Sequence, residues 1–391
     1  MPGFQPEARQ QWAKLVSQGD RADADLLDAM ENTSQAVWIT GGSANDARVA
    51  AMTTVHKAEA KRQMPVLVLY DLPFRDCGQY SAGGAPGTEA YEAWIDGVAR
   101  GIGEHAAVVL LEPDGLGIIP YNTDVNGNAE WCRPDLTGTD LTPETANAAR
   151  YEQLRYAVDA LTANPNAKVY LDGTHAAWLG VGDIADRLVR AGVERAAGFF
   201  LNVSNYQYTA NSVYYGTWIS QCIAQGDYGN CPNQYWNGGP DGTKIADLLG
   251  AWQGVALSPY GEWSVDADDP ALNVSGYVSR FWGTPATHFV IDTSRNGAGP
   301  WQPPAGVYTD AQDWCNPPGR GLGPRPTADT GDGLVDAYLW VKVPGQSDGQ
   351  CTRGTEGPVD PAWGIVDPPA GAWFPQQALE LAQNANPPLG P

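Results

Sequence analysis

Seven short apolar runs alternate with longer amphipathic segments along this chain. The runs cover residues 35–40, 65–70, 106–112, 167–171, 197–202, 287–292 and 335–342. Their apolar residues follow one another almost without interruption, which is typical of strands that are covered on both faces. Helical patterns lie between several of them, as over 87–103, 142–164 and 181–192. The order strand, helix, strand predicts parallel pairing with crossover connections, and therefore an α/β fold.

Polar residues follow each apolar run. Tyr70 and Asp71 end the second run, and Glu112 and Asp114 lie at the end of the third. In α/β barrels the functional site lies at the carboxyl ends of the strands, whereas an open parallel sheet uses a switch point on the same edge. Polar groups at every strand end favour a seven-stranded parallel β/α barrel whose mouth forms one site.

The chain shows no low-complexity linker and no repeat of fixed period. Clusters of Pro and Gly at 82–87, 316–326 and 367–371 are followed by periodic segments or by the end of the chain. We therefore expect a single domain over residues 1–391.

Charge and aromatic content narrow the classes of partner. The formal net charge of −22 argues against nucleic acid and against anionic membrane surfaces, but it leaves a neutral partner such as a sugar open. The 15 Trp and 17 Tyr far outnumber the 7 Phe. Flat rings with a polar edge suit sugar stacking, although core packing alone accounts for most of them.

The cysteines and histidines argue against a metal site. No CxxC pair occurs, and the four histidines are spread over positions 56, 105, 175 and 288. We expect no metal and no other cofactor. The even number of cysteines, 6, suggests three disulfides and an oxidising compartment.

The compartment can be narrowed further. No apolar run approaches the length of a membrane span. The first residues lack the apolar stretch of a signal peptide. We expect a secreted, extracellular protein whose signal peptide is absent from this sequence.

The densest chemical feature is the segment LLEPDGLG at 110–117. Asp114 follows a buried run, so desolvation should raise the pKa of its carboxyl group and suit it to general acid catalysis. Asp76 follows the neighbouring run and would raise this pKa further. Two such carboxyl groups are the arrangement of a glycoside hydrolase, although structural caps and turns use Asp equally well.

One motif points to a different class of enzyme. The segment GVGDIA at 180–185 fits the glycine pattern of dinucleotide-binding proteins. It does not directly follow a strand, however, and the next strand ends in Asn202 instead of an acidic residue. We interpret it as a helix start, and a cofactor-dependent α/β enzyme remains only a rival hypothesis.

Eight segments carry a resemblance to a known family. They are VLYDLPFRDCGQYSAGG, LLEPDGLG, VYLDGTHAAWLG, GFFLNVSNYQ, HFVIDTSRNGAGP, DWCNPPGRGLGPRPT, AYLWVKVPGQSDG and AWFPQQALELAQNANP, in order between residues 65 and 388. Together they resemble the cellulases of glycoside hydrolase family 6. The resemblance implies a distorted seven-stranded α/β barrel that cleaves β-1,4-glucan with inversion at the anomeric carbon.

The resemblance also implies roles for individual residues. Asp114 corresponds to the general acid, and Asp76 to the carboxylate that raises the pKa of the acid and helps to position water. Asp348 corresponds to the proposed base, and Tyr70 to the tyrosine beneath the distorted sugar. The implied sugar-binding residues are the platforms Trp38, Trp178 and Trp314 and the polar residues Asp172, His175, Asn202, Arg295 and Lys342.

Two disulfides follow from the resemblance, Cys77–Cys132 and Cys315–Cys351. Cys222 and Cys231 are additional to the family pattern, and we predict a third, local disulfide between them.

Three positions depart from the family pattern. Gln346 stands where the family usually has Glu, which should lower the pKa of Asp348 and keep it ionised. Ser81 and Ala82 compete for the position of a water-holding serine. Val181 occupies a site where processive members tend to carry a second tryptophan.

The sequence carries features of two modes of attack on the glucan chain, within the chain and from its ends. The spacing of Cys351 from Asp348, together with Val181, favours an endoglucanase, whereas the long segments 216–283 and 352–371 could cover the cleft as in a cellobiohydrolase. We expect an endoglucanase that acts as a monomer on cellulose and cellooligosaccharides. A glucan-binding protein without activity is a weaker alternative, because all three carboxylates Asp76, Asp114 and Asp348 are present.

Overall fold

The predicted strands form one parallel sheet. The computed structural model describes residues 5–125, 127–234, 256–278 and 281–389. The strands are β1 (Val37–Ile39), β2 (Val66–Leu69), β3 (Ala107–Leu111), β4 (Ala167–Asp172), β5 (Gly198–Leu201), β6 (His288–Asp292) and β7 (Val335–Leu339). They lie in sequence order, and every neighbouring pair is parallel. The prediction of seven parallel strands is confirmed.

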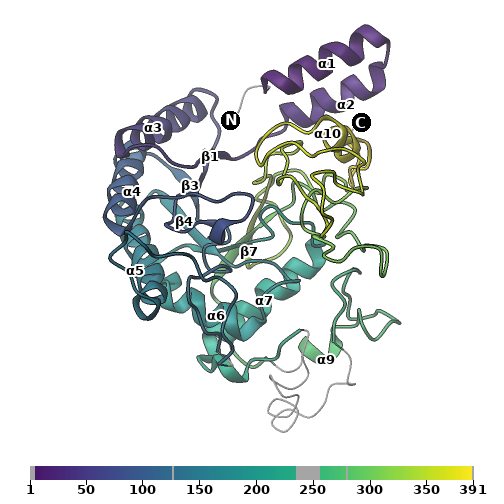
Figure 1. The fold of residues 1–391 in the computed structure, drawn as a ribbon. Helices are drawn as coiled ribbons and strands as arrows, with labels where there is room; N and C mark the ends of the chain where they lie inside the picture. The colour runs from purple at the N-terminus through teal and green to yellow at the C-terminus, as the bar shows by residue number, and fades with distance from the viewer. Residues whose placement is uncertain (1–4, 126, 235–255, 279–280, 390–391) are drawn as a thin grey trace.

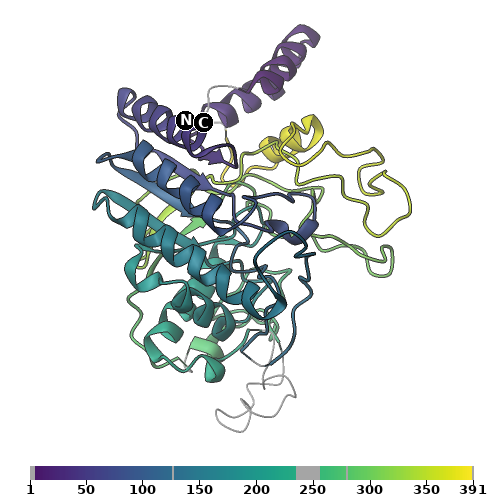
Figure 2. The same ribbon diagram turned by 60° about the vertical axis from the view of Figure 1, so that its left-hand side comes forward.

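Several of the described helices lie around the curled sheet, and others pack together near the ends of the chain. The described α-helices are α1 (Pro6–Gln18), α2 (Arg21–Asn32), α3 (Ala44–Ala60), α4 (Thr88–Ile102), α5 (Pro143–Thr162), α6 (Val181–Arg190), α7 (Thr209–Gln225), α9 (Ser275–Val278) and α10 (Pro375–Gln383). In Figure 1, α3 to α7 follow one another around the outside of the sheet. Figure 2 shows α3, α4 and α5 side by side along one flank. The helices expected at 87–103, 142–164 and 181–192 are present as α4, α5 and α6.

The two edge strands approach each other without forming a ladder in the described part of the chain. The backbone N–H of Ala36 donates to Trp340 O at 2.9 Å, and the indole N–H of Trp38 donates to Val341 O at 2.9 Å. The sheet therefore curls into a half-barrel, which agrees with the distorted barrel that the resemblance implied.

Side chains alternate between the two faces of the sheet. Leu67 and Leu69 on β2 face outward into the main core beneath the helices, and Val68 between them faces inward. The inner core also contains Leu110 and Tyr170, which are in register with Val68, and Phe200 and Val290, which are in register with each other. Because all seven strands run parallel, their carboxyl ends lie at the same mouth of the sheet.

The two ends of the chain lie against each other. Helix α1 begins at Pro6 and ends before Gly19, whose φ of 88° is the left-handed conformation that a helix stop uses. A separate apolar cluster joins Leu27 and Met30 of α2 to Leu381 of α10. Figure 1 shows this hairpin of α1 and α2 beside α10, apart from the sheet.

All three predicted disulfides are present, and they pair Cys77 with Cys132, Cys222 with Cys231 and Cys315 with Cys351. In the described residues, no helix has both the length and the apolar character to cross a membrane.

Candidate active site

A cleft of about 370 Å³ opens at the carboxyl ends of the strands. Segments that end or follow each of the seven strands contribute to it, which agrees with the site expected from the polar strand ends. Its lining includes Trp38, Tyr70, Asp76, Ser81, Asp114, Trp131, His175, Trp178, Tyr206, Trp314, Lys342 and Asp348. A parallel sheet places residues that are far apart in the sequence around one opening.

Asp114 lies in the turn after β3 and lines this cleft. Burial raises the pKa of its carboxyl group well above the ordinary value, and the negative charges of Asp172 and Asp76 raise it further. Lys342 acts in the opposite direction but does not outweigh them. Burial and these neighbouring charges therefore favour the protonated form of Asp114, which is the form that a general acid requires.

Asp76 lies on the loop after β2 and is held by backbone contacts. Its Oδ2 accepts the N–H of Ser81 at 2.7 Å, and the disulfide of the adjacent Cys77 ties the loop to Cys132. Asp76 and Cys77 have backbone φ values of 58° and 49°, which residues other than glycine seldom adopt. Such strain persists where the surrounding contacts fix the conformation, and functional sites are common examples.

Two buried ionisable residues, Glu112 and Arg150, hold the Asp76 loop and the Asp114 turn together. The Glu112 carboxyl group accepts the backbone N–H groups of Asp71 and Leu72 at 2.9 and 3.1 Å. Arg150 on α5 donates to Gly115 O and Pro73 O, both at 2.8 Å. These bonds fix the Asp114 turn relative to the Asp76 loop. The sequence does not predict this contact of Arg150, because a single arginine within a helical pattern does not indicate which loop it will bind.

Asp348, after β7, is surrounded by donors. Its Oδ2 accepts from Arg295 at 2.9 Å, from Tyr206 OH at 3.0 Å and from the backbone N–H of Asn316 at 3.0 Å, while Lys342 Nζ lies 3.1 Å from Oδ1. Burial raises the pKa of this carboxyl group, but the charges of Arg295 and Lys342 outweigh burial and hold the pKa below its ordinary value. Asp348 is therefore a carboxylate at neutral pH.

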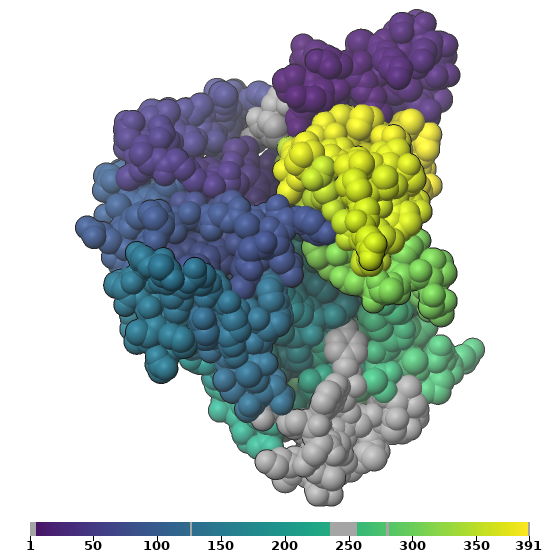
Figure 3. All heavy atoms as spheres, viewed as in Figure 1, coloured from purple at the N-terminus to yellow at the C-terminus, as the bar shows by residue number. Residues whose placement is uncertain are grey.

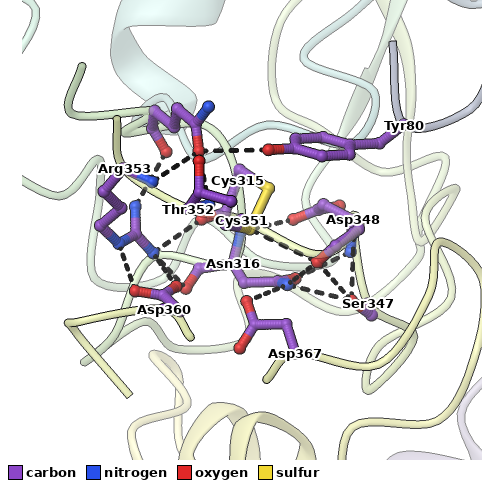
Figure 4. Close-up of a disulfide and its surroundings, with 12 residues drawn as sticks. Tyr80, Cys315, Asn316, Ser347, Asp348, Cys351, Thr352, Arg353, Asp360 and Asp367 are labelled. Atoms are coloured by element: carbon purple, nitrogen blue, oxygen red, sulfur yellow. Dashed lines mark hydrogen bonds and ion pairs between the residues drawn. A yellow bond between two sulfur atoms is a disulfide. The ribbon is translucent and has the colours of Figure 1, made fainter. Parts of the chain in front are cut away.

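The loop that carries Asp348 rests on a hydrogen-bonded network beside the Cys315–Cys351 disulfide (Figure 4). Asn316 Nδ2 donates to Ser347 Oγ at 3.0 Å and to Asp367 Oδ2 at 2.8 Å, and Asn316 Oδ1 accepts the Asp348 N–H at 2.8 Å. Arg353 pairs with Asp360 at 2.8 Å in the same buried layer. The segment after Cys351 is therefore held by buried hydrogen bonds and supports the loop that carries Asp348.

Aromatic rings are spread along the cleft. Trp38 lies edge-on to Tyr70 at 5.5 Å between ring centroids, and Trp314, which is 37% exposed, lies 5.9 Å from Tyr80. Trp178 packs on Gly117, where an added Cβ would lie 2.4 Å from its ring. The second glycine of LLEPDGLG therefore makes room for this ring. The three predicted platforms all line the cleft.

The predicted polar residues divide into two groups. His175 and Lys342 line the cleft, and burial lowers the pKa of His175 to about 3, so the imidazole is neutral. Asp172, Asn202 and Arg295 lie behind the cleft surface and are almost completely buried.

Each of these three buried residues has partners within the protein. Asp172 accepts the Thr174 N–H at 2.9 Å, and its charge is the largest electrostatic influence on the pKa of Asp114. Asn202 Nδ2 donates to Asp292 O at 2.9 Å, which joins the ends of β5 and β6. Arg295 supports Asp348. The described contacts therefore give them organising roles behind the cleft.

Three aromatic residues of the cleft were not predicted from the sequence. Tyr206 donates to Asp348, and Tyr80 packs against Gly349, where an added Cβ would lie 2.6 Å from the Tyr80 side chain. Trp131 is 55% exposed beside Cys132. All three follow strand ends at a distance, so the only signal was the excess of Tyr and Trp.

The departures from the family pattern have clear positions. Ser81 lines the cleft and Ala82 does not, which favours Ser81 as the serine near Asp76. Gln346 Nε2 donates to Gln5 Oε1 at 3.1 Å. Val181 is buried at the start of α6, and Gly180 is its N-cap, so GVGDIA opens a helix as interpreted.

The described part of the cleft holds no group of close metal ligands. Two such groups occur elsewhere in the described residues. One consists of Cys351, Asp360 and Asp367, but its sulfur is committed to a disulfide. The other consists of His56, Glu59 and His105.

Comparison with known proteins decides the family of this chain. The sequence profile described as Glycosyl hydrolases family 6 matches residues 2–385. The chain belongs to glycosyl hydrolase family 6. The resemblance that the eight segments carried is confirmed.

Some relatives that match this family 6 chain are named endoglucanases, and others are named cellobiohydrolases. It is 33% identical over 98% of its length to Endoglucanase A of Cellulomonas fimi, of which it covers 61%. It is 30% identical over 82% of its length to a probable 1,4-beta-D-glucan cellobiohydrolase C of Aspergillus niger, of which it covers 60%. The chain thus spans about three fifths of the length of these relatives.

A solved structure of the same family has the same fold. The endoglucanase Cel6 from Mycobacterium tuberculosis, in complex with methyl-cellobiosyl-4-deoxy-4-thio-beta-D-cellobioside, is 32% identical. The match has a TM-score of 0.62 and covers 92% of this chain and 89% of that chain. The ligand is bound in the structure of the Mycobacterium tuberculosis protein.

Proposed function

We propose that this chain hydrolyses β-1,4-glucosidic bonds in cellulose, within the glucan chain and with inversion at the anomeric carbon. The observation that carries the proposal is the position of Asp114, whose pKa burial and nearby carboxylates raise, in a cleft where carboxyl groups from other strand ends converge. Aromatic rings along the same cleft provide surfaces for pyranose rings. An acid beside a carboxylate is the arrangement that glycoside hydrolysis uses.

The reaction proceeds by single displacement. Asp114 gives its proton to the glycosidic oxygen, and the bond from that oxygen to the anomeric carbon breaks. A water molecule near Asp76 and Ser81 attacks the opposite face of the sugar, and its proton passes to Asp348. The proton balance is restored when Asp348 loses this proton to solvent and Asp114 regains one. The product carries the α configuration at the new reducing end.

Asp348 is a weak base because its pKa is low. Asp348 stays ionised, so its negative charge stabilises the oxocarbenium-like positive charge that forms on the sugar. It accepts the proton of the water molecule only as the bond from that water to the sugar forms. Tyr70 lies at the floor of the cleft, where the sugar to be cleaved would rest.

Endo action is the mode that we favour. Val181 is buried and provides no additional platform, and Cys351 returns the chain to the protein body three residues after Asp348. Endoglucanase names among the relatives support the same mode. The test is the ratio of viscosity loss to reducing sugar on carboxymethylcellulose. A steep loss of viscosity at low sugar release is expected, and cellobiose release with little loss of viscosity would refute endo action.

One observation favours exo action as a second candidate. Tyr80 OH lies 3.4 Å from Gln312 Oε1, and its ring packs on Gly349, so the loop after β2 contacts the loops after β6 and β7. In Figure 3 the blue part of the chain that includes this loop meets the yellow C-terminal part. Such a bridge would enclose a glucan chain. The same viscosity measurement distinguishes the two modes.

Further properties belong to the same proposal. We infer a single catalytic domain over 1–391 that acts as a monomer and uses no cofactor for hydrolysis. Three disulfides support an oxidising, extracellular environment. The net charge of −22 supports a neutral glucan partner instead of nucleic acid or an anionic membrane.

A further inference from the structure

Three metal-ligating side chains meet on the outside of the barrel, away from the cleft. His56 and Glu59 lie one turn apart on α3, and His105 lies in the turn between α4 and β3. The two imidazole rings are 5.3 Å apart between centroids, and His105 Nδ1 lies 2.6 Å from Glu59 Oε1. One ligand atom from each of the three side chains lies within 4.8 Å of the other two.

Close packing of two helices creates this meeting point. Helix α4 carries Gly97 and Gly101 where it touches α3, and an added Cβ would lie 2.1 Å from Ala44 O and 2.3 Å from Arg48 O respectively. Only glycine permits this approach. The turn after α4 is therefore held against the second half of α3, where His56 and Glu59 lie.

The third ligand is fixed through its backbone. The carbonyl oxygen of His105 accepts Asn164 Nδ2 at 2.8 Å, and its N–H donates to Ile102 O at 3.3 Å. The side chains remain accessible, with exposed fractions of 39% for His105 and 48% for Glu59. The position of His105 is therefore set in advance, while an ion can still approach from solvent.

We propose that His56, Glu59 and His105 bind a transition-metal ion, with Zn²⁺ as the best fit. Two imidazole nitrogens and one carboxylate oxygen match the ligands that zinc prefers, whereas Mg²⁺ and Ca²⁺ prefer oxygen alone. Zinc bonds of about 2.1 Å place neighbouring ligand atoms roughly 3.4 Å apart, so small side-chain rotations suffice. A water molecule would complete the coordination.

The position of the site indicates a structural role. His105 precedes β3, so the site lies at the amino ends of the strands, opposite the mouth that holds Asp114. An ion there would link α3 to the α4–β3 turn. The pairing of His105 with Glu59 is an ordinary surface contact by itself, and the second imidazole is the feature that points to a metal.

The fold changes the argument from the sequence. Wide spacing of the histidines along the chain spoke against a metal site, because His56 and His105 are 49 positions apart. The packing of α3 against α4 brings these two histidines together, so their distance in the sequence does not exclude a shared metal site.

The test is titration of chelator-treated whole protein with ZnCl₂, followed by calorimetry and by the midpoint of thermal unfolding. One equivalent should bind and raise the midpoint, since an ion that binds only the folded state stabilises it. His56→Ala and His105→Ala should weaken the affinity by about tenfold or more, which is at least the effect of losing an outer-shell partner of a metal ligand. Glu59→Gln provides a further variant of nearly identical shape.

His288→Ala is the matched control. His288 Nδ1 pairs with Asp336 Oδ1 at 2.8 Å at the amino end of β6, with side-chain exposure of 44% and 36%. It is a similar surface pair, but it belongs to none of the ligand groups found in the described residues. If zinc does not saturate at one equivalent, or if His288→Ala weakens binding as much as His105→Ala, the proposal is wrong. Cleavage of cellulose plays no part in either readout.

Discussion

The guanidinium of Arg295 lies 2.9 Å from Asp348 Oδ2, and neither side chain is appreciably exposed to solvent. Arg295 comes from the loop after β6 and Asp348 from the loop after β7, so the pair joins two strand ends. Removing one partner would leave an uncompensated charge in the protein interior. Asp348 therefore combines a structural role with its proposed chemical role.

These two roles of Asp348 can be separated. Asp348→Ala should lower the turnover number by about 10²–10⁴-fold and destabilise the fold by roughly 3–5 kcal/mol, because Arg295 loses its partner. Added azide, a small anion, should restore part of the activity if the carboxylate accepts a proton. Urea unfolding and activity assays measure the two effects. Activity that azide leaves unchanged would speak for a purely structural Asp348.

Asp114→Asn should remove the general acid while keeping the shape of the side chain. We expect a loss of about 10²–10⁴-fold on cellulose. On an aryl cellobioside with a good leaving group the loss should be much smaller, because that group departs without a proton. Asp159→Asn, which alters an exposed partner of Arg195, serves as the control. An equal loss on both substrates would contradict the assignment of Asp114.

The free energy of unfolding should fall as the pH rises from 5 to 8. Burial raises the pKa of Glu112 to about 8 and that of Asp172 to about 7. The unfolded chain loses these protons at lower pH, so their stabilising effect is complete below the unfolded pKa and is lost as the pH rises through the folded value. Each unit of difference corresponds to about 1.4 kcal/mol.

Urea midpoints at pH 5 and pH 8 measure this change. In Glu112→Gln the decrease between the two pH values should become smaller, whatever the absolute stability of the variant. A wild-type midpoint that is higher at pH 8 would show that the raised pKa values are incorrect.

The Cys77–Cys132 disulfide should matter for both stability and activity. It joins cysteines 55 positions apart, and replacing both by Ser should cost about 4 kcal/mol by loop entropy. Activity should fall as well, because Asp76 adjoins Cys77. The Cys222–Cys231 pair, 9 positions apart, is the control, with an expected cost of about 2.6 kcal/mol and little change in activity. Chemical unfolding and assays on cellulose distinguish the two pairs, and equal activity in both variants would argue against a role of the loop in positioning Asp76.

Trp131 should bind sugar although its sequence gave no sign of this role. Trp131→Ala is expected to raise the Michaelis constant for long cellooligosaccharides with little effect on turnover, because the half-exposed ring lines the cleft but carries no acid or base for the reaction. Trp282→Ala, at an exposed tryptophan outside the lining of the cleft, is the control. If both variants behave alike, Trp131 is not a platform.

The strands were predictable because their signal is local. Leu67, Val68 and Leu69 are adjacent apolar residues, and burial on both faces leaves no polar alternative. Asp114 was predictable for a similar reason, since it follows a buried strand directly. Arg150 and Tyr206 were not predictable, because each acts on a loop from another element that is distant in sequence.

The sequence predicted the order of strands and helices, several of the residues at the mouth and the family, because these depend on patterns of neighbouring residues. Only the tertiary structure decided that Asp172 and Arg295 act from behind the cleft and that Tyr80 reaches across it. It also decided that His56 meets His105. The physical reason is that pKa values, ion pairs and ligand groups depend on distances in space, which packing of helices and curling of the sheet create.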